Sequence, residues 1–270
     1  MPMFLTSDAV SLHYNDWGHG RPVVLIHGWP MSSASWDYHA TRLAESGYRV
    51  ISYDRRGFGR SDQPWSGYDY DTLSDDLAQL IEHLNLHDVT LVGYSMGSGE
   101  VARYLTRHGD RRIAAAVLLA GVTPQLASSP GNPDGMTLAA FDGLMQALRQ
   151  DRQRFFGDYA QASFSEPGLR DWYLAQTYQS SERAIAACAQ AWYATNFRKD
   201  LAGIKVPTLI LHGARDDSAP AATTGRLAAQ MIGHSQYLEY PEAGHYLLIE
   251  QKDAVLHDLL AFLAGDRSIG

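Results

Sequence analysis

The 270-residue sequence predicts an α/β protein, in which buried strands alternate with amphipathic helices. Uncharged apolar runs, such as residues 89–92 and 113–119, are typical of strands buried on both faces of a sheet. Other segments place apolar residues at helical spacing, most clearly at 72–84. The length and a hydrophobic content of 45% suit a single domain, 1–270, with a large core.

The first part of the chain contains three further predicted strands and one predicted helix start. Residues 10–14 alternate between polar and apolar side chains, as an edge strand does. Residues 23–26 are an apolar run typical of a central strand, and residues 49–53 are predicted to form the next strand. Thr72 is expected to open the helix at 72–84, because Thr-Leu-Ser-Asp resembles a capping box with Asp in place of Glu.

Ser95 lies in the most informative stretch of the sequence. A predicted strand at 89–92 leads into Gly-Tyr-Ser-Met-Gly at 93–97, and a predicted helix follows at 100–105. In this Gly-x-Ser-x-Gly pattern the serine occupies a strained turn between strand and helix, and the glycines allow the two elements to approach closely. Free N–H groups at the helix start would face a developing oxyanion.

The same residues also resemble a dinucleotide-binding fingerprint. Residues 97–102 fit Gly-x-Gly-x-x-Ala. That interpretation requires an acidic residue at the end of the next strand, to hold a ribose hydroxyl. The next predicted strand, 113–119, is followed by Ala-Gly-Val, so a nucleotide site is not favoured.

The strand and helix alternation is interrupted at about 123–200. Glycine and proline punctuate the start of this stretch, and short aromatic-rich helices are predicted for the rest. We expect a helical cap insertion that covers Ser95 and excludes water. Most of its aromatic side chains are expected to form ordinary helix core, and only a few to face a pocket.

The alternation resumes with strands predicted at 206–211 and 236–240, separated by a helix at about 221–231 and followed by a closing helix. Asp216 and His245 follow these two strands and are expected at the same sheet edge as Ser95. A serine hydroxyl needs a base, and the base needs an orienting acid. We therefore predict a Ser95, His245 and Asp216 triad, with Asp217 as the less favoured acid.

Three other features have a functional and a structural interpretation. His27 follows a strand and precedes glycine, which favours a loop-ordering role over catalysis. Arg55 and Arg56 suggest an anion site, but a structural turn capped by Asp54 is favoured. His83 and His87 are four residues apart and could face one metal ion, but no third ligand is apparent, so no metal site is expected.

Composition excludes several classes of function. The net charge is −8 and no basic stripe is present, so neither nucleic acid nor an anionic membrane is an expected partner. The single cysteine, Cys188, is expected to be a buried small hydrophobe. No signal-peptide pattern or membrane-spanning apolar run is found, which predicts a cytoplasmic protein. No haem, flavin or metal motif is visible, so no cofactor is expected.

Taken together, these motifs resemble the α/β-hydrolase superfamily, and in particular its cofactor-free esterase, perhydrolase and "non-haem haloperoxidase" group. The similarity covers nearly the whole chain. It is carried by His-Gly-Trp-Pro at 27–30, the stretches 53–61 and 99–104, the serine motif at 93–97, and Thr-Leu-Ile-Leu-His-Gly at 208–213. The resemblance implies the α/β-hydrolase fold, a mostly parallel eight-stranded sheet flanked by helices.

The resemblance also implies a site and a reaction. Ser95, Asp216 and His245 would be the triad, and the backbone N–H groups of Trp29 and Met96 would form the oxyanion hole. A substrate pocket is expected from Trp29, Pro30, Phe164, Trp192 and Tyr246. The substrate would be a small carboxylic ester. Group members with proline at the position of Pro30 are often perhydrolases, so hydrogen peroxide is a candidate acyl acceptor.

Some alternatives remain open. Gly244-His245-Tyr246 departs from the perhydrolase pattern, in which proline often precedes the histidine and glycine and phenylalanine follow it. A lactonase, amidase or lactamase would use the same triad, and a hydrolase-fold receptor would bind a small ligand with little turnover. A dehalogenase or epoxide hydrolase would need a carboxylate where Ser95 stands. Homo-oligomers occur in similar groups, but no segment here identifies an interface.

Overall fold

The computed structural model describes residues 2–265, so the two ends of the predicted 1–270 domain lie outside the described residues. Eight strands form one sheet in the order β1-β2-β4-β3-β5-β6-β7-β8. The sheet is parallel from β4 to β8, and β2 pairs antiparallel with both β1 and β4. The strands are β1 (Met3–Leu5), β2 (Ser11–Gly18), β3 (Pro22–Ile26), β4 (Arg49–Tyr53), β5 (Val89–Tyr94), β6 (Ile113–Leu119), β7 (Thr208–Gly213) and β8 (Ser235–Tyr240).

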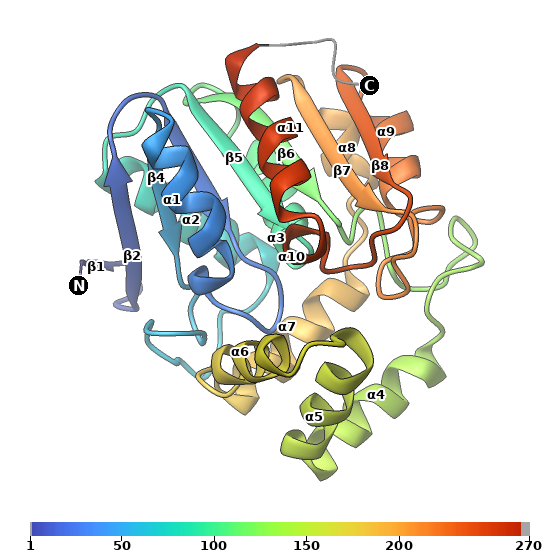
Figure 1. Ribbon diagram of the computed structural model, residues 1–270. Helices are drawn as coiled ribbons and strands as arrows, with labels where there is room; N and C mark the ends of the chain where they lie inside the picture. Colours follow the sequence, from blue (N-terminus) through green and yellow to red (C-terminus); the bar gives the residue numbers. More distant parts are fainter. Residues whose placement is uncertain (1, 266–270) are drawn as a thin grey trace.

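Helices cover both faces of this twisted sheet (Figure 1). On one face, α1 (Asp37–Glu45) packs beside α11 (Lys252–Ala264). On the other face, a row of contacting helices comprises α2 (Tyr70–His83), α3 (Met96–Arg107), α8 (Arg198–Gly203) and α9 (Gly225–Met231). The short elements η1 (Ser33–Trp36) and α10 (Leu247–Glu250) follow β3 and β8.

The interior strands are mostly apolar because both of their faces are buried. Every residue of β5 and β7 is buried, and β3 is buried from its second residue onward. Such strands have no polar face, which is why they appear in the sequence as continuous apolar runs. The sheet therefore fixes the carboxyl ends of β3, β5, β7 and β8 at one edge.

The start of α2 differs from the sequence prediction. The helix begins at Tyr70, and Asp69 is its N-cap, whose side chain accepts a hydrogen bond from the Thr72 N–H at 3.0 Å. Thr72 instead donates its hydroxyl to the second Asp69 oxygen at 2.9 Å. The expected cap at Thr72 is therefore wrong, because the preceding aspartate can satisfy the free amides one turn earlier.

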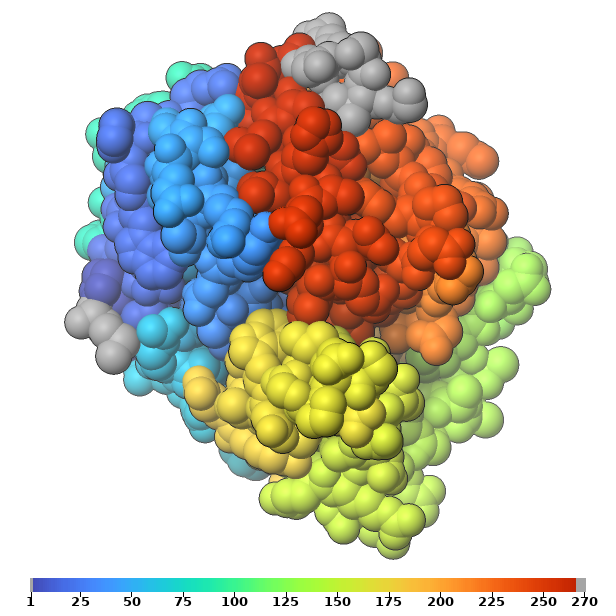
Figure 2. Space-filling model, viewed as in Figure 1, coloured from blue at the N-terminus to red at the C-terminus, as the bar shows by residue number. Residues whose placement is uncertain are grey.

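Helices α4 (Leu138–Gln150), α5 (Arg152–Ser163), α6 (Pro167–Thr177) and α7 (Glu182–Ala194) follow β6 and precede α8. They form a separate block below the sheet in Figures 1 and 2, in green to yellow. Aromatic side chains fill its interior, for example the Phe141 and Tyr193 rings, which stack at 4.0 Å between centroids. The loop before α4 contains only isolated bridges among the described residues, at Ala127 with Met136 and Ser129 with Asn132.

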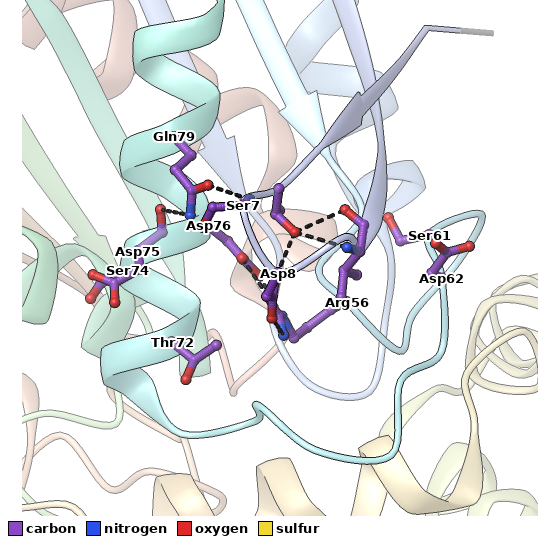
Figure 3. Close-up of polar contacts among 12 residues, drawn as sticks. Ser7, Asp8, Arg56, Ser61, Asp62, Thr72, Ser74, Asp75, Asp76 and Gln79 are labelled. Atoms are coloured by element: carbon purple, nitrogen blue, oxygen red, sulfur yellow. Dashed lines mark hydrogen bonds and ion pairs between the residues drawn. The ribbon is translucent and has the colours of Figure 1, made fainter.

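The two arginines after β4 form ion pairs with carboxylates of other elements. Arg56 lies between Asp8, in the turn after β1, and Asp76 on α2, as Figure 3 shows. Arg55 pairs with Glu100 on α3 at 2.9 Å. Asp54 accepts backbone N–H groups from Ser33 and Arg60 at 2.8 and 3.0 Å. The structural interpretation of this turn is confirmed, because both guanidinium groups stabilise the fold.

No helix among residues 2–265 is both long enough and apolar enough to cross a bilayer.

Candidate active site

Ser95 lies between β5 and α3 in a strained backbone conformation. Its φ of 53° and ψ of −116° fall outside the regions that a non-glycine residue normally occupies. Three hydrogen bonds hold the turn. The Ser95 N–H donates to the Leu119 carbonyl at 2.8 Å, while the N–H and the hydroxyl of Ser98 donate to the Ser95 carbonyl at 3.0 and 2.6 Å. The surrounding structure therefore fixes this side chain at the sheet edge.

The two glycines of the motif are required by close backbone contacts. A Cβ atom on Gly93 would lie 2.3 Å from the Gly97 carbonyl oxygen. A Cβ atom on Gly97 would lie 2.7 Å from the carbonyl oxygen of Ile26 on the neighbouring strand β3. A side chain at either position would require α3 or β3 to shift, so glycine is the residue that fits this turn without strain.

His245 joins Ser95 to Asp216. The His245 Nε2 atom lies 2.9 Å from the Ser95 hydroxyl oxygen, and its Nδ1 atom lies 2.8 Å from Asp216 Oδ2. Asp216 follows β7 and His245 follows β8, so the three side chains come from separate strand ends at one edge. The second Asp216 oxygen accepts the N–H groups of Ser218 and Ala219 at 3.0 and 2.7 Å. These contacts are those that the predicted Ser95, His245 and Asp216 triad requires.

The electrostatics suit these three roles. Burial alone would raise the pKa of Asp216, but the charge of His245 and the hydrogen bonds of His212 and His245 lower that pKa well below its usual value. Burial alone would lower the pKa of His245, but the charge and hydrogen bond of Asp216 raise it above its usual value. Asp216 therefore stays ionised, which favours proton uptake by His245.

The two residues predicted to supply the oxyanion hole lie on different elements. Met96 is the first residue of α3, directly after Ser95, and Trp29 lies in the loop after β3. Among residues 2–265, neither N–H donates to a protein acceptor. Both N–H groups therefore stay the predicted donors to an oxyanion.

His27 orders the Trp29 loop and is too deeply buried to act on a substrate. Its Nε2 atom accepts the Arg55 N–H at 3.0 Å, which leaves the proton on Nδ1, 2.8 Å from the Gly28 carbonyl. Burial and, to a lesser extent, the charge of Arg55 lower the pKa of His27 to about 3. The predicted structural role of this histidine is confirmed.

A cavity of about 300 Å³ opens onto Ser95 and His245. Of the predicted pocket residues, Trp29 and Trp192 line it, with their rings 5.8 Å apart. Pro30, Phe164 and Tyr246 do not line it. Phe164 and Tyr246 are 3% and 4% exposed and pack against each other behind the wall, with ring centroids 4.6 Å apart. The structure therefore brings together the triad and two of the five predicted pocket residues.

Several lining residues were not identified from the sequence. They are Val122, Leu126, Met136, Leu144, Phe155, Tyr159, Ser218 and Ala219. Asp217, considered as the alternative acid, also lines the cavity but has no hydrogen bond to His245. His212 is a further missed neighbour, because its Nε2 atom lies 3.3 Å from Asp216 Oδ2. The only sequence signal for His212 is its place at the end of an apolar strand.

This sheet, with a serine on a strained strand-to-helix turn and a histidine and an aspartate from later strand ends, defines an enzyme of the α/β-hydrolase class. Residues 21–252 match the family model for the alpha/beta hydrolase fold.

Individual relatives agree with this class. A non-heme chloroperoxidase, CPO-A1, of Kitasatospora aureofaciens is 41% identical over 275 residues, covering 97% of this chain and 99% of that protein. A bifunctional esterase/perhydrolase of Acinetobacter calcoaceticus is 35% identical over 270 residues, covering 96% and 98%. The solved structure of an esterase from Exiguobacterium antarcticum has a TM-score of 0.94 at 31% identity and covers 97% and 98%.

The chain belongs to the α/β-hydrolase family, and within it to the group of non-heme haloperoxidases and esterase/perhydrolases. The predicted fold class and the predicted resemblance are both confirmed.

Proposed function

We propose that this enzyme hydrolyses small carboxylic esters through an acyl-enzyme on Ser95. The observation that carries the proposal is the continuous hydrogen-bond path from Ser95 through His245 to Asp216, with distances of 2.9 and 2.8 Å, at the floor of an apolar cavity. The names of the relatives, which include an esterase and an esterase/perhydrolase, support the same chemistry.

In the first half-reaction, the Ser95 oxygen attacks the ester carbonyl carbon while His245 Nε2 accepts the hydroxyl proton. The carbonyl oxygen becomes an oxyanion, and the N–H groups of Trp29 and Met96 donate to it. One such donor is worth about 3 to 4 kcal/mol of barrier in comparable sites. His245 then gives its proton to the leaving alcohol oxygen, and the acyl group stays on Ser95.

In the second half-reaction, water replaces the alcohol. His245 removes a proton from the water as its oxygen attacks the acyl carbon, and the proton returns to Ser95 when the carboxylic acid leaves. Hydrogen peroxide could take the place of water by the same steps and would give a peracid. The relative described as a bifunctional esterase/perhydrolase favours this second acceptor.

The proposal is tested by initial rates on p-nitrophenyl esters of short and medium acyl chains, with the wild type compared with Ser95→Ala. We expect turnover in the wild type and its loss in the variant, by roughly 10⁶-fold in kcat. Peracid formation in the presence of peroxide is measured on the same ester. Equal rates for the two proteins would refute the proposed role of Ser95.

A further inference from the structure

One corner of the cavity is polar, although most of its wall is aliphatic or aromatic. This corner, which we call the acceptor corner, consists of Tyr159 on α5 and of Asp217 and Ser218 after β7. The Tyr159 and Ser218 oxygens are 3.1 Å apart, and the Ser218 oxygen lies 3.5 Å from Asp217 Oδ1. The three groups therefore form a chain along the wall that ends in a carboxylate.

The groups of the acceptor corner that remain free to bind a ligand are hydrogen-bond acceptors. A carboxylate only accepts, so Ser218 donates its single proton to Asp217. Ser218 can then only accept from Tyr159, which uses the Tyr159 proton as well. Burial raises the pKa of Tyr159, so its hydroxyl keeps that proton. What remains are acceptor lone pairs and the negative charge of Asp217, which suit a donor or a cation in the ligand.

The acceptor corner is connected to His245 through Asp216. The N–H of Ser218 is bonded to Asp216 at 3.0 Å, and Asp216 is bonded to His245 at 2.8 Å. Because His245 must protonate the departing alcohol, that alcohol lies beside His245 and away from the oxyanion donors. The acceptor corner is therefore placed to contact the alcohol part of an ester.

The aromatic wall is compatible with a cation at this place. Trp29, Phe155 and Trp192 line the same cavity, and aromatic faces attract ammonium groups. Asp217 is exposed at the cavity, so a positively charged alcohol group could reach it without losing all of its water.

We infer that the enzyme favours esters whose alcohol part carries an ammonium group, and that Asp217 determines this preference. The inference rests on the proposed ester hydrolysis. It predicts that protonated 2-(dimethylamino)ethyl butyrate has a higher kcat/KM than the neutral isostere 3-methylbutyl butyrate, by about three- to tenfold. Added salt should reduce the difference, because the carboxylate is partly solvated.

The experiment measures both esters near neutral pH with the wild type, with Asp217→Asn and with a control, Asp158→Asn. Asp158 lies on the same helix as Tyr159, is 77% exposed and does not line the cavity, so its loss changes the net charge equally. Butyrylcholine and 3,3-dimethylbutyl butyrate form a second isosteric pair. In this pair the charged ester, butyrylcholine, has no N–H donor. The readout is kcat/KM of the charged ester divided by kcat/KM of its neutral isostere. A loss of active enzyme lowers both values equally and leaves this ratio unchanged.

The inference predicts that Asp217→Asn brings both ratios close to one while Asp158→Asn leaves them at the wild-type value. If only the dimethylamino ester is preferred over its neutral isostere, the preference comes from the N–H hydrogen bond. If the charged ester is preferred in both pairs, it comes from the charge. Serine-dependent turnover with ratios near one in the wild type, or with ratios unchanged in Asp217→Asn, would overturn the inference and leave the proposed function standing. Absence of turnover on every ester would overturn both.

Discussion

Replacing Glu100 with alanine should strongly destabilise the protein, because it leaves a buried cation without its carboxylate. Glu100 and Arg55 have side chains that are 0% and 1% exposed, and their Oε2 and Nε atoms are 2.9 Å apart. Tyr53 also donates its hydroxyl to Glu100. In Glu100→Ala the main acceptor left to Arg55 is the His27 carbonyl, at 2.8 Å. Breaking a buried pair in this way costs about 3–5 kcal/mol.

The free energy of unfolding is measured from urea titrations and the midpoint temperature from thermal scans. We expect the midpoint to fall by roughly 6–15 °C. Asp16→Ala is the matched control, because its pair with Arg49 is partly exposed, at 26% and 32%, and its loss should cost less than about 1 kcal/mol. The double variant Arg55→Met, Glu100→Met should be more stable than either single methionine variant, since no unpaired charge remains.

The double variant also separates stability from activity. Arg55 Nη2 donates to the His27 carbonyl, two residues before Trp29, so its loss should slow ester hydrolysis even where the fold is restored. A cost of less than about 1 kcal/mol for Glu100→Ala, equal to the Asp16→Ala control, would refute the reasoning that this pair is buried and interdependent.

The remaining predictions concern the base, its acid and two glycines. Because Asp216 raises the pKa of His245 above its usual value of about 6.5, kcat/KM should fall as the pH drops through that raised pKa and His245 becomes protonated. Asp216→Asn should shift this limb of the kcat/KM profile to lower pH, because burial then dominates, and should lower kcat by about 10⁴. Gly97→Ala should destabilise the protein by about 1–3 kcal/mol in urea titrations, because its Cβ would contact the Ile26 carbonyl. Gly143→Ala, at an open position in α4, should stabilise it by about 0.5–1 kcal/mol.

The sequence predicted the interior of the sheet well, because buried parallel strands are uninterrupted apolar runs. The predicted strands at 49–53 and 113–119 have the same bounds as β4 and β6. Less regular elements were harder to predict. The buried residues of α1 are only His39, Ala40 and Leu43, too few for a clear helical period, and β1 has three residues. The strand expected at 206–211 is β7, Thr208–Gly213. Its pairing with β8 begins at Thr208 and continues to Gly213.

The polar centre of the site was predictable for a topological reason. Ser95, Asp216 and His245 each follow a strand of a largely parallel sheet, so the sheet alone brings them to one edge. The cavity wall depends instead on how the helices after β6 fold over that edge. Tyr159 lies on α5 and Phe164 is the residue directly after that helix, yet only Tyr159 lines the cavity. No local pattern distinguishes two such aromatic residues.

The central claim is that Ser95 carries the acyl group, and the most direct measurement is covalent labelling with a fluorophosphonate, followed by intact-mass and peptide mass spectrometry. Attack by the Ser95 oxygen on phosphorus expels fluoride and leaves a stable phosphonyl ester. The account predicts one adduct per chain in the wild type, located on Ser95, no adduct in Ser95→Ala, and slow labelling in His245→Ala. An adduct of equal yield in Ser95→Ala, or one mapped to another residue, would contradict the account.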